Sequence, residues 1–315
     1  MNIRRWVETI INLCGCRMKD SMFNSGVLKY LYNKYDFIIR FTYTRVPLIR
    51  DMLQKIMFWK MYSSDFKRID DIFIELGKTF DQYDITFKDK QILELGPGNS
   101  IALALNFLCS GADKYLMADK YPRILKTEKQ AKHLLEQVTF YEDKYPCNLD
   151  KFVNKDSLKF NEAFLAYTPD SAEDLRNTPS NSVDIILSIS VFEHIRDVEK
   201  SFQEMKRVLK EGGIIYHSID MRDHYNFNEP FKFLKYSDST WDNYLTKEGY
   251  SYTNRLRVDD FDNLLIKYGF EIISINKNNY ESDLPDKNAF SDKFRDKDIE
   301  TLKVVGIKLL AKKCN

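Results

Sequence analysis

The chain has 315 residues, of which 43% are hydrophobic and 14% aromatic, which is enough apolar material for one large domain with an extension or for two domains. Its 48 Lys and Arg nearly balance its 47 Asp and Glu, and the formal net charge of +1 lacks the basic excess typical of nucleic-acid-binding proteins. No run approaches the roughly 20 apolar residues of a transmembrane helix, and Glu8 interrupts the apolar segment that a signal peptide would need. We therefore expect a cytoplasmic protein that does not bind nucleic acid.

The cysteines are odd in number and scattered, at Cys14, Cys16, Cys109, Cys147 and Cys314. This distribution indicates a reducing compartment rather than a disulfide framework. Cys14 and Cys16 have no second ligand pair and no nearby histidine, so they do not predict a zinc site. We expect no bound metal.

Residues 1–62 differ from the rest of the chain in charge, with eleven Lys and Arg against four Asp and Glu. Aromatic and aliphatic residues lie between these charges, and Leu48, Met52 and Ile56 recur at helical spacing. The favoured interpretation is a helical extension over residues 1–80 that packs on a main domain at 81–315. The alternative is a basic amphipathic surface that contacts anionic lipid at the inner face of a membrane, or a phosphorylated substrate.

Strands and helices are predicted to alternate along the chain. Strands are expected at 92–95, 114–119, 164–168, 183–190, 214–220, 270–275 and 303–312. Helices are expected at 65–76 with a stop at Gly77, from about 100, at 122–137, after 195 with a stop at Gly212–Gly213, and at 261–268, while 138–160 is expected to be irregular. This alternation predicts a doubly wound, mostly parallel seven-stranded sheet with helices on both faces. Only a loop separates the last two strands, so one of them is expected to run antiparallel at the edge.

The turn after the first strand carries the clearest functional signal. Glycines at 96 and 98 leave the backbone N–H groups of the following helix open to a ligand, and Glu94 ends the strand before them. Asp119 ends the second strand and lies 21 residues beyond Gly98, close to the ~20 expected for a carboxylate that binds ribose hydroxyls. Since the carboxyl ends of parallel strands meet at one edge of the sheet, we expect these residues to form one site.

Two ligand classes fit this turn. A dinucleotide site needs a third glycine that lets the helix pack close to the strand, and Ile101 occupies that position. The sequence from Glu94 to Ser100, with Gly96-x-Gly98-x-Ser100, instead resembles the first motif of class I S-adenosylmethionine-dependent methyltransferases. A nicotinamide-dependent oxidoreductase is kept as the alternative.

The resemblance continues over roughly residues 88–220. The segments 181–184 and 191–195 are similar to the fourth-strand block of the "type 11" methyltransferases, and 171–175 is similar to the segment that lies along the adenine ring, where either Ser171 or Asp170 contacts the base. The resemblance implies a Rossmann-like fold and S-adenosylmethionine as cofactor. The cofactor-binding residues that it implies are Glu94, Gly96, Gly98, Asn99, Asp119, Lys120, Ser171, Ala172, Ser190 and Glu193.

Three side chains near the ends of the fourth and fifth strands are candidates for catalysis. The family motif places His194 beside the transferred methyl group, and Asp220 follows the fifth strand. His217 lies within that strand, so it faces either the cleft or the core, where a histidine is more often structural. Each could accept a proton from a hydroxyl acceptor.

The segment 225–252 contains nine aromatic residues and lies in a predicted lid at about 223–260. Trp241, Tyr236 and Tyr244 are candidates for stacking on a sugar ring or an aromatic acceptor, or for forming a small core of the lid. The fourth strand ends in Ser188-Ile189-Ser190-Val191 rather than an Asn-Pro-Pro-Tyr signature, which argues against methylation of a nucleobase amine. The sequence therefore predicts methyl transfer to a small molecule or glycan, at oxygen, with a catalytically silent binding module as a further alternative.

Overall fold

The structure is a computed structural model, and it describes residues 66–121, 127–224, 229–246, 252–282 and 284–314. These residues form two compact units. The sheet unit contains the described residues of 63–220, 258–278 and 306–315, and the insert unit contains those of 221–257 and 279–305. The basic segment 1–62 lies outside the described residues, so both of its interpretations stay predictions, as does the predicted division of the chain at residue 80.

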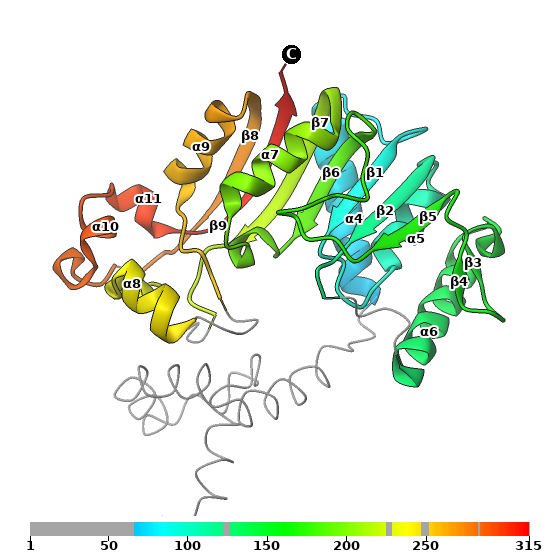
Figure 1. The fold of residues 1–315 in the computed structure, drawn as a ribbon, viewed down its shortest axis with the longest axis horizontal. Helices are drawn as coiled ribbons and strands as arrows, with labels where there is room; N and C mark the ends of the chain where they lie inside the picture. The colour runs from blue at the N-terminus through cyan, green and yellow to red at the C-terminus, as the bar shows by residue number, and fades with distance from the viewer. Residues whose placement is uncertain (1–65, 122–126, 225–228, 247–251, 283, 315) are drawn as a thin grey trace, which may run out of the picture. The chain divides into compact units, whose positions relative to one another are not determined.

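A seven-stranded sheet with the order β5-β2-β1-β6-β7-β9-β8 organises the sheet unit (Figure 1). Its strands are β1 (Gln91–Leu95), β2 (Lys114–Ala118), β5 (Leu165–Thr168), β6 (Val183–Ile189), β7 (Leu209–Asp220), β8 (Phe270–Asn279) and β9 (Val304–Lys313). The strands from β5 to β7 in this order pair in parallel, and β9 runs antiparallel to β7. The predicted α/β fold class is confirmed, and the antiparallel strand β9 lies next to the edge strand β8.

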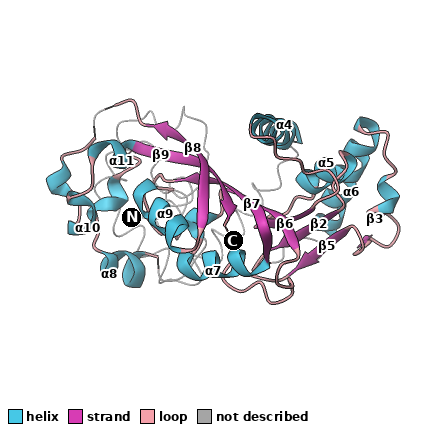
Figure 2. Ribbon diagram, turned by 90° about the horizontal axis from the view of Figure 1, so that it is seen from above, coloured by secondary structure: helices cyan, strands magenta, loops and turns pink. Residues whose placement is uncertain are grey.

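Helices cover both faces of this sheet, because parallel neighbours must be joined by crossover connections. Helices α4, α5 and α6 lie on one face, and α7 and α9 lie on the other (Figure 2). The helices are α4 (Phe66–Gln82), α5 (Ala102–Cys109), α6 (Glu128–Lys144), α7 (Val198–Val208) and α9 (Val258–Lys267). Of the helices in the described part of the chain, none combines the length and the hydropathy needed to span a membrane.

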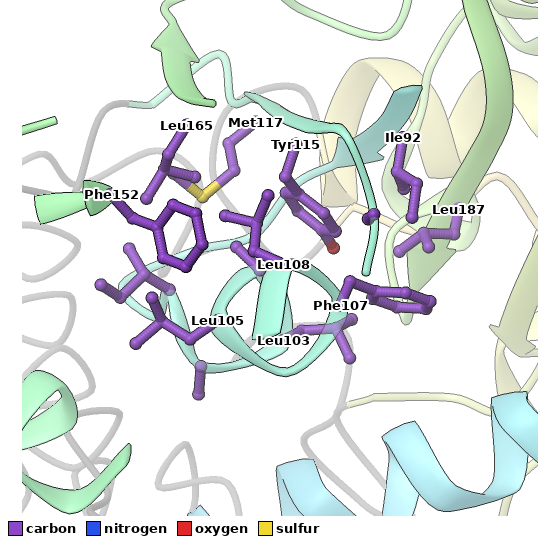
Figure 3. Packing of buried hydrophobic residues seen from close by; sticks show 14 of the residues in the cluster. Ile92, Leu103, Leu105, Phe107, Leu108, Tyr115, Met117, Phe152, Leu165 and Leu187 are labelled. Atoms are coloured by element: carbon purple, nitrogen blue, oxygen red, sulfur yellow. The ribbon is translucent and has the colours of Figure 1, made fainter. Parts of the chain in front are cut away.

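Helix α5 lies at the centre of the main core (Figure 3). Every residue from Ala102 to Leu108 is buried, as expected for a helix that is apolar all round. The ring of Phe107 packs edge-on against Phe73 and Phe87, with centroid distances of 5.0 and 5.1 Å. Because the core holds the helix on all sides, the position where α5 begins is fixed, and so is the turn before it.

Several predicted element boundaries are wrong because packing between elements overrides local signals. Helix α4 passes through Gly77 and continues to Gln82, since Leu76 and Phe80 on either side of the glycine are both buried in the core. Helix α7 ends at Val208. The Gly212–Gly213 pair lies inside β7 rather than at the end of the helix.

The segment expected to be irregular, 138–160, is also more ordered than predicted. Helix α6 begins at Glu128 and continues to Lys144, because Val138 and Tyr141 extend its buried face. Beyond it, the two-residue strands β3 (Val153–Asn154) and β4 (Lys159–Phe160) pair antiparallel.

A disulfide joins Cys109 at the end of α5 to Cys147, just after α6. The expectation that the cysteines are unpaired is therefore wrong for this pair. The two residues are 38 positions apart, and only the packing of α6 beside α5 brings their Cα atoms to 5.8 Å. Of the described cysteines, Cys314 is free and exposed.

The insert unit has its own aromatic core, formed by two chain segments. Its short helical elements are η3 (Lys232–Lys235), α8 (Asp238–Thr240), η4 (Trp241–Leu245), η5 (Lys287–Ala289), α10 (Asp292–Arg295) and α11 (Ile299–Lys303). Trp241 and Phe233 from the first segment pack with Phe290 and Phe294 from the second. The core thus includes the segment 279–305 as well as the region predicted as a lid.

Two buried arginines connect the backbone of the insert unit. The terminal nitrogens of Arg255 donate to the carbonyl oxygens of Phe233 and Tyr236, and its guanidinium also pairs with Asp238. Arg257 donates to the carbonyl oxygens of Met221, Leu302 and Val304, which lie on both segments. These bonds supply side-chain donors to buried backbone carbonyl groups of the insert unit.

Candidate functional site

The turn between β1 and α5 depends on its two glycines for different reasons. Gly96 and Gly98 have φ of 70° and 67°. A Cβ on Gly96 would lie 2.6 Å from Cγ2 of Val191, the second residue after β6, whereas a Cβ on Gly98 would meet no atom within 4 Å. Gly96 is therefore required by the close approach of Val191, and Gly98 leaves open space above the turn in which a ligand can lie.

A buried glutamine from α6 occupies the N-terminus of α5. The Oε1 atom of Gln137 accepts hydrogen bonds from the N–H of Ile101 and the hydroxyl of Ser100, both at 2.8 Å. Its Nε2 donates to the carbonyl of His133 at 3.2 Å and lies 3.5 Å from the carbonyl of Asn99. A pyrophosphate bound at this helix end would compete with Gln137 for the N–H of Ile101 and with the Ser100 hydroxyl for the N–H of Ala102, so the arrangement disfavours a dinucleotide.

Sequence reasoning missed Gln137. Its one signal is a polar residue among the apolar positions Leu134, Val138 and Tyr141 of the same helix. Such a residue indicates that a buried polar partner is needed, but it does not identify the turn at Ser100 as that partner.

Glu94 lies in β1 with its side chain buried, only 7% of the residue being exposed. The hydroxyl of Tyr115 in β2 donates to its Oε2 at 2.9 Å. Burial raises the pKa of Glu94 to about 8; the hydrogen bond from Tyr115 opposes the rise and the charge of Asp119 adds to it. A carboxyl group in this state is stabilised as the anion when a cation binds beside it.

Asp119 follows β2 and contacts the turn, as its spacing from Gly98 predicts. Its Oδ2 accepts from the N–H of Gly98 at 3.2 Å, and its Oδ1 accepts from the N–H of Tyr121 at 2.8 Å. These two bonds orient the Asp119 carboxylate toward the turn between β1 and α5. The neighbouring Lys120 extends to Glu173, with 3.8 Å between Nζ and Oε2.

The loop after β5 is closed by Asp170. This buried carboxylate accepts from the backbone N–H and the side-chain amide of Asn177, at 3.1 and 2.6 Å. Ser171 and Ala172 are partly buried, and Ser171 forms an isolated bridge with Asp174. Of the two residues proposed for the adenine contact, Asp170 thus binds Asn177 of its own loop. The contact of Ser171 with the adenine stays a prediction.

The chain turns sharply where β6 ends. Ser190 has φ of 55°, and its N–H donates to the carbonyl of Ser218 at 2.8 Å. The short 3₁₀ helix η2 (Phe192–His194) follows, with Glu193 buried and His194 partly buried. The structure therefore places Ser190, Glu193 and His194 at the carboxyl end of β6, where the sequence predicts them.

His217 lies inside the sheet unit. Its Nδ1 is 2.8 Å from the hydroxyl of Ser188, its register partner on β6, and its ring centroid is 4.1 Å from that of Phe192. Only 1% of the residue is exposed, and burial lowers its pKa to about 3. Asp220 is partly buried at the end of β7. Of these two candidates, Asp220 is therefore the one that reaches the end of the strand.

A protein-family model described as "Methyltransferase domain" matches residues 93–217. No curated protein matches the chain by sequence. Among solved structures, an S-adenosylmethionine-dependent methyltransferase from Mesorhizobium loti is 14% identical, covering 74% of this chain and 95% of that chain with a TM-score of 0.41. An N-methyltransferase from Haemonchus contortus, in complex with phosphomonomethylethanolamine and S-adenosylhomocysteine, is 17% identical, covering 78% of this chain and 53% of that chain with a TM-score of 0.44.

Proposed function

We propose that this chain is a class I S-adenosylmethionine-dependent methyltransferase that uses S-adenosylmethionine as its cofactor and methylates an oxygen atom of a small-molecule or glycan acceptor; a methyltransferase-domain model matches its residues 93–217. The family match extends from β1 into β7 and so includes every candidate site residue except Asp220. The nicotinamide alternative receives no support from this match, and Gln137 already accepts from the N–H of Ile101 at the helix end where a pyrophosphate would bind.

The residues at the turn fit a nucleoside with a cationic tail. Asp119 places a carboxylate, a group that accepts hydrogen bonds from a ribose diol, beside the turn, and the space above Gly98 admits a ligand. Glu94 supplies the buried carboxyl group that suits the ammonium of the methionine part. Ser171 and Ala172 lie after β5, in the segment proposed for the adenine ring.

One observation carries the assignment of an oxygen acceptor. The segment after β6 contains the imidazole of His194, whereas enzymes that methylate a nucleobase amine have the amide of an Asn-Pro-Pro-Tyr signature there. When bound, the cofactor supplies a methyl group on a sulfonium, which an oxygen nucleophile accepts by in-line displacement. A hydroxyl acceptor must lose its proton, and a base at hydrogen-bonding distance accelerates the transfer by about 10²–10⁴-fold. His194 and Asp220 are the candidates for this base.

His217 is poorly suited to this task. Its Nδ1 is occupied by Ser188, its ring is covered by Phe192, and its low pKa prevents it from holding a proton near neutral pH. We assign His217 a structural role, in which it contacts Ser188 and Phe192. We propose that His194 accepts the proton.

The insert unit supports an acceptor with a ring to stack on. Most of its aromatic side chains are buried in its own core, including Trp241, Phe231 and Phe233. Tyr244 is 50% exposed and Tyr236 is partly buried. We therefore assign stacking on a sugar or phenol ring to Tyr244, with Trp241 holding the segment in place.

The test is a transfer assay with radiolabelled methyl donor across glycans, lipids, small phenols and small amines, followed by mass spectrometry of the product. We expect O-methylation in the first or third class. The His194→Ala variant should lose about 10²–10⁴-fold in kcat while retaining cofactor affinity, and His217→Asn should lose far less. Transfer to amines alone would overturn the oxygen assignment.

A further inference from the structure

Glu94 and Tyr115 form an isolated polar pair in an apolar region of the sheet. In the β1–β2 register Glu94 pairs with Met117 and Ile92 pairs with Tyr115, so the two polar residues are diagonal neighbours on one face. Tyr115 has no exposed surface, and its ring lies 5.8 Å from that of Phe107. The 2.9 Å bond between Tyr115 Oη and Glu94 Oε2 is thus shielded from water.

A carboxylate in this position lacks a compensating charge. Tyr115 acts on Glu94 from β2 and Asp119 acts on it from the end of β2, and the described parts of α4, α5 and β6 add no further charged group. Burial of an ion without an opposite charge is costly, so the group keeps its proton instead. In agreement with this, burial raises the pKa of Glu94 to about 8 and raises the pKa of Tyr115 well above its usual value.

We infer that Glu94 and Tyr115 form a proton-coupled cation site, in which Glu94 releases its proton when the ammonium group of the cofactor binds. The O–H bond of the carboxyl group breaks, its electron pair stays on the oxygen, and the proton passes to the buffer. Tyr115 keeps its own proton and donates to the carboxylate that forms, which makes it a positioning residue. This inference rests on the cofactor placement proposed above.

The direct test is calorimetric titration with S-adenosylhomocysteine between pH 6 and pH 9, in buffers that differ in ionisation enthalpy. Because Glu94 is protonated in the free protein below its pKa of about 8, binding at pH 6–7 should release close to one proton. The release should fade above the pKa, and Kd should rise about tenfold for each pH unit below it. 5′-Methylthioadenosine, a nucleoside without the ammonium group, should release none.

Two variants separate the contributions of the pair. Glu94→Gln should bind S-adenosylhomocysteine without proton release and with little pH dependence. Tyr115→Phe removes the donor to the carboxylate, so the midpoint of proton release should move to higher pH, with weaker binding at pH 7 and recovery near pH 9. Tyr216→Phe is the matched control, because it also removes a buried strand hydroxyl but does not contact Glu94.

Tight binding by the wild-type protein without proton exchange would overturn the inference and leave the cofactor placement standing. Failure to bind S-adenosylhomocysteine at any pH would overturn both. If the pH midpoint of proton release were unchanged in Tyr115→Phe, Tyr115 would have no positioning role. Should Glu94→Gln fail to fold, the wild-type protein and Tyr115→Phe still decide the question.

Discussion

Two buried charged side chains, Arg255 in the insert unit and Glu94 in the sheet unit, have opposite surroundings. In the insert unit, the guanidinium of Arg255 reaches two backbone carbonyls and one carboxylate, and it lies 5.1 and 5.3 Å from the rings of Trp241 and Phe294. In the sheet unit, the carboxyl of Glu94 accepts a hydrogen bond from Tyr115 and has no cationic partner among the described side chains that shift its pKa. A buried charge with local partners holds a fold together, whereas a buried carboxyl without a counter-charge indicates where a ligand completes the site.

The strongest way to challenge this comparison is to remove the carboxylate of Asp119, which we propose binds the ribose. Asp119→Ala should weaken binding of S-adenosylhomocysteine by about 3 kcal/mol or more, on the order of 100-fold in Kd, because two hydrogen bonds to a charged acceptor are lost. Calorimetric titration measures the change. The fold should persist, since the β2 backbone pairs on both sides.

Asp113→Ala provides the matched control for this change. Asp113 is an exposed aspartate just before the amino end of β2, away from the turn. Its replacement should leave the affinity for S-adenosylhomocysteine unchanged. Equal affinities of the two variants would remove Asp119 from the cofactor site.

The second prediction concerns the insert unit. Arg255→Met removes the side-chain donor to the carbonyl of Tyr236 and one of two donors to the carbonyl of Phe233, so the free energy of unfolding should fall by about 2–4 kcal/mol. Chemical denaturation measures the loss, and Kd for S-adenosylhomocysteine should stay constant. Lys293→Met is the control, because this more exposed lysine pairs with the same Asp238 and should cost less than about 1 kcal/mol. If Arg255→Met and Lys293→Met lowered the free energy of unfolding equally, the burial of Arg255 would contribute nothing to stability.

The smallest expected effect concerns Gly96 in the turn between β1 and α5. Two variants distinguish its steric contact with Val191 from its positive φ. Gly96→Ala should lower the free energy of unfolding by about 2–3 kcal/mol, through the positive φ and the contact with Val191. Adding Val191→Ala removes the two methyl groups in the way and should recover about 1 kcal/mol despite its own cost. Strictly additive losses in the double variant would contradict the steric explanation.

The sheet and the turn could be predicted from sequence because their signals are local or have fixed spacing. The strand before Gly96, the 21 residues between Gly98 and Asp119, and the apolar helix all follow from periodicity and turn chemistry. A methyltransferase-domain model matches residues 93–217, while the individual site residues stay predictions.

The features that sequence reasoning missed depend on contacts between distant parts of the chain. Gln137 acts at a turn 36 residues before it, and Cys109 pairs with Cys147 only because α6 packs against α5. The insert unit combines 221–257 with 279–305 through Arg257, and no local pattern marks that arginine as buried. Packing decides each of these positions, so periodicity alone does not reveal them.

The disulfide between Cys109 and Cys147 closes part of the polypeptide into a covalent ring. The ring contains β2, Asp119 and Gln137, so the carboxylate proposed to bind the ribose and the glutamine at the α5 N-terminus belong to the same closed loop. A protease that cuts the chain once within this loop would leave both fragments joined. The cleaved protein would run as one band on a non-reducing gel and as two bands after reduction. Before reduction, Asp119 and Gln137 would still belong to one covalent molecule.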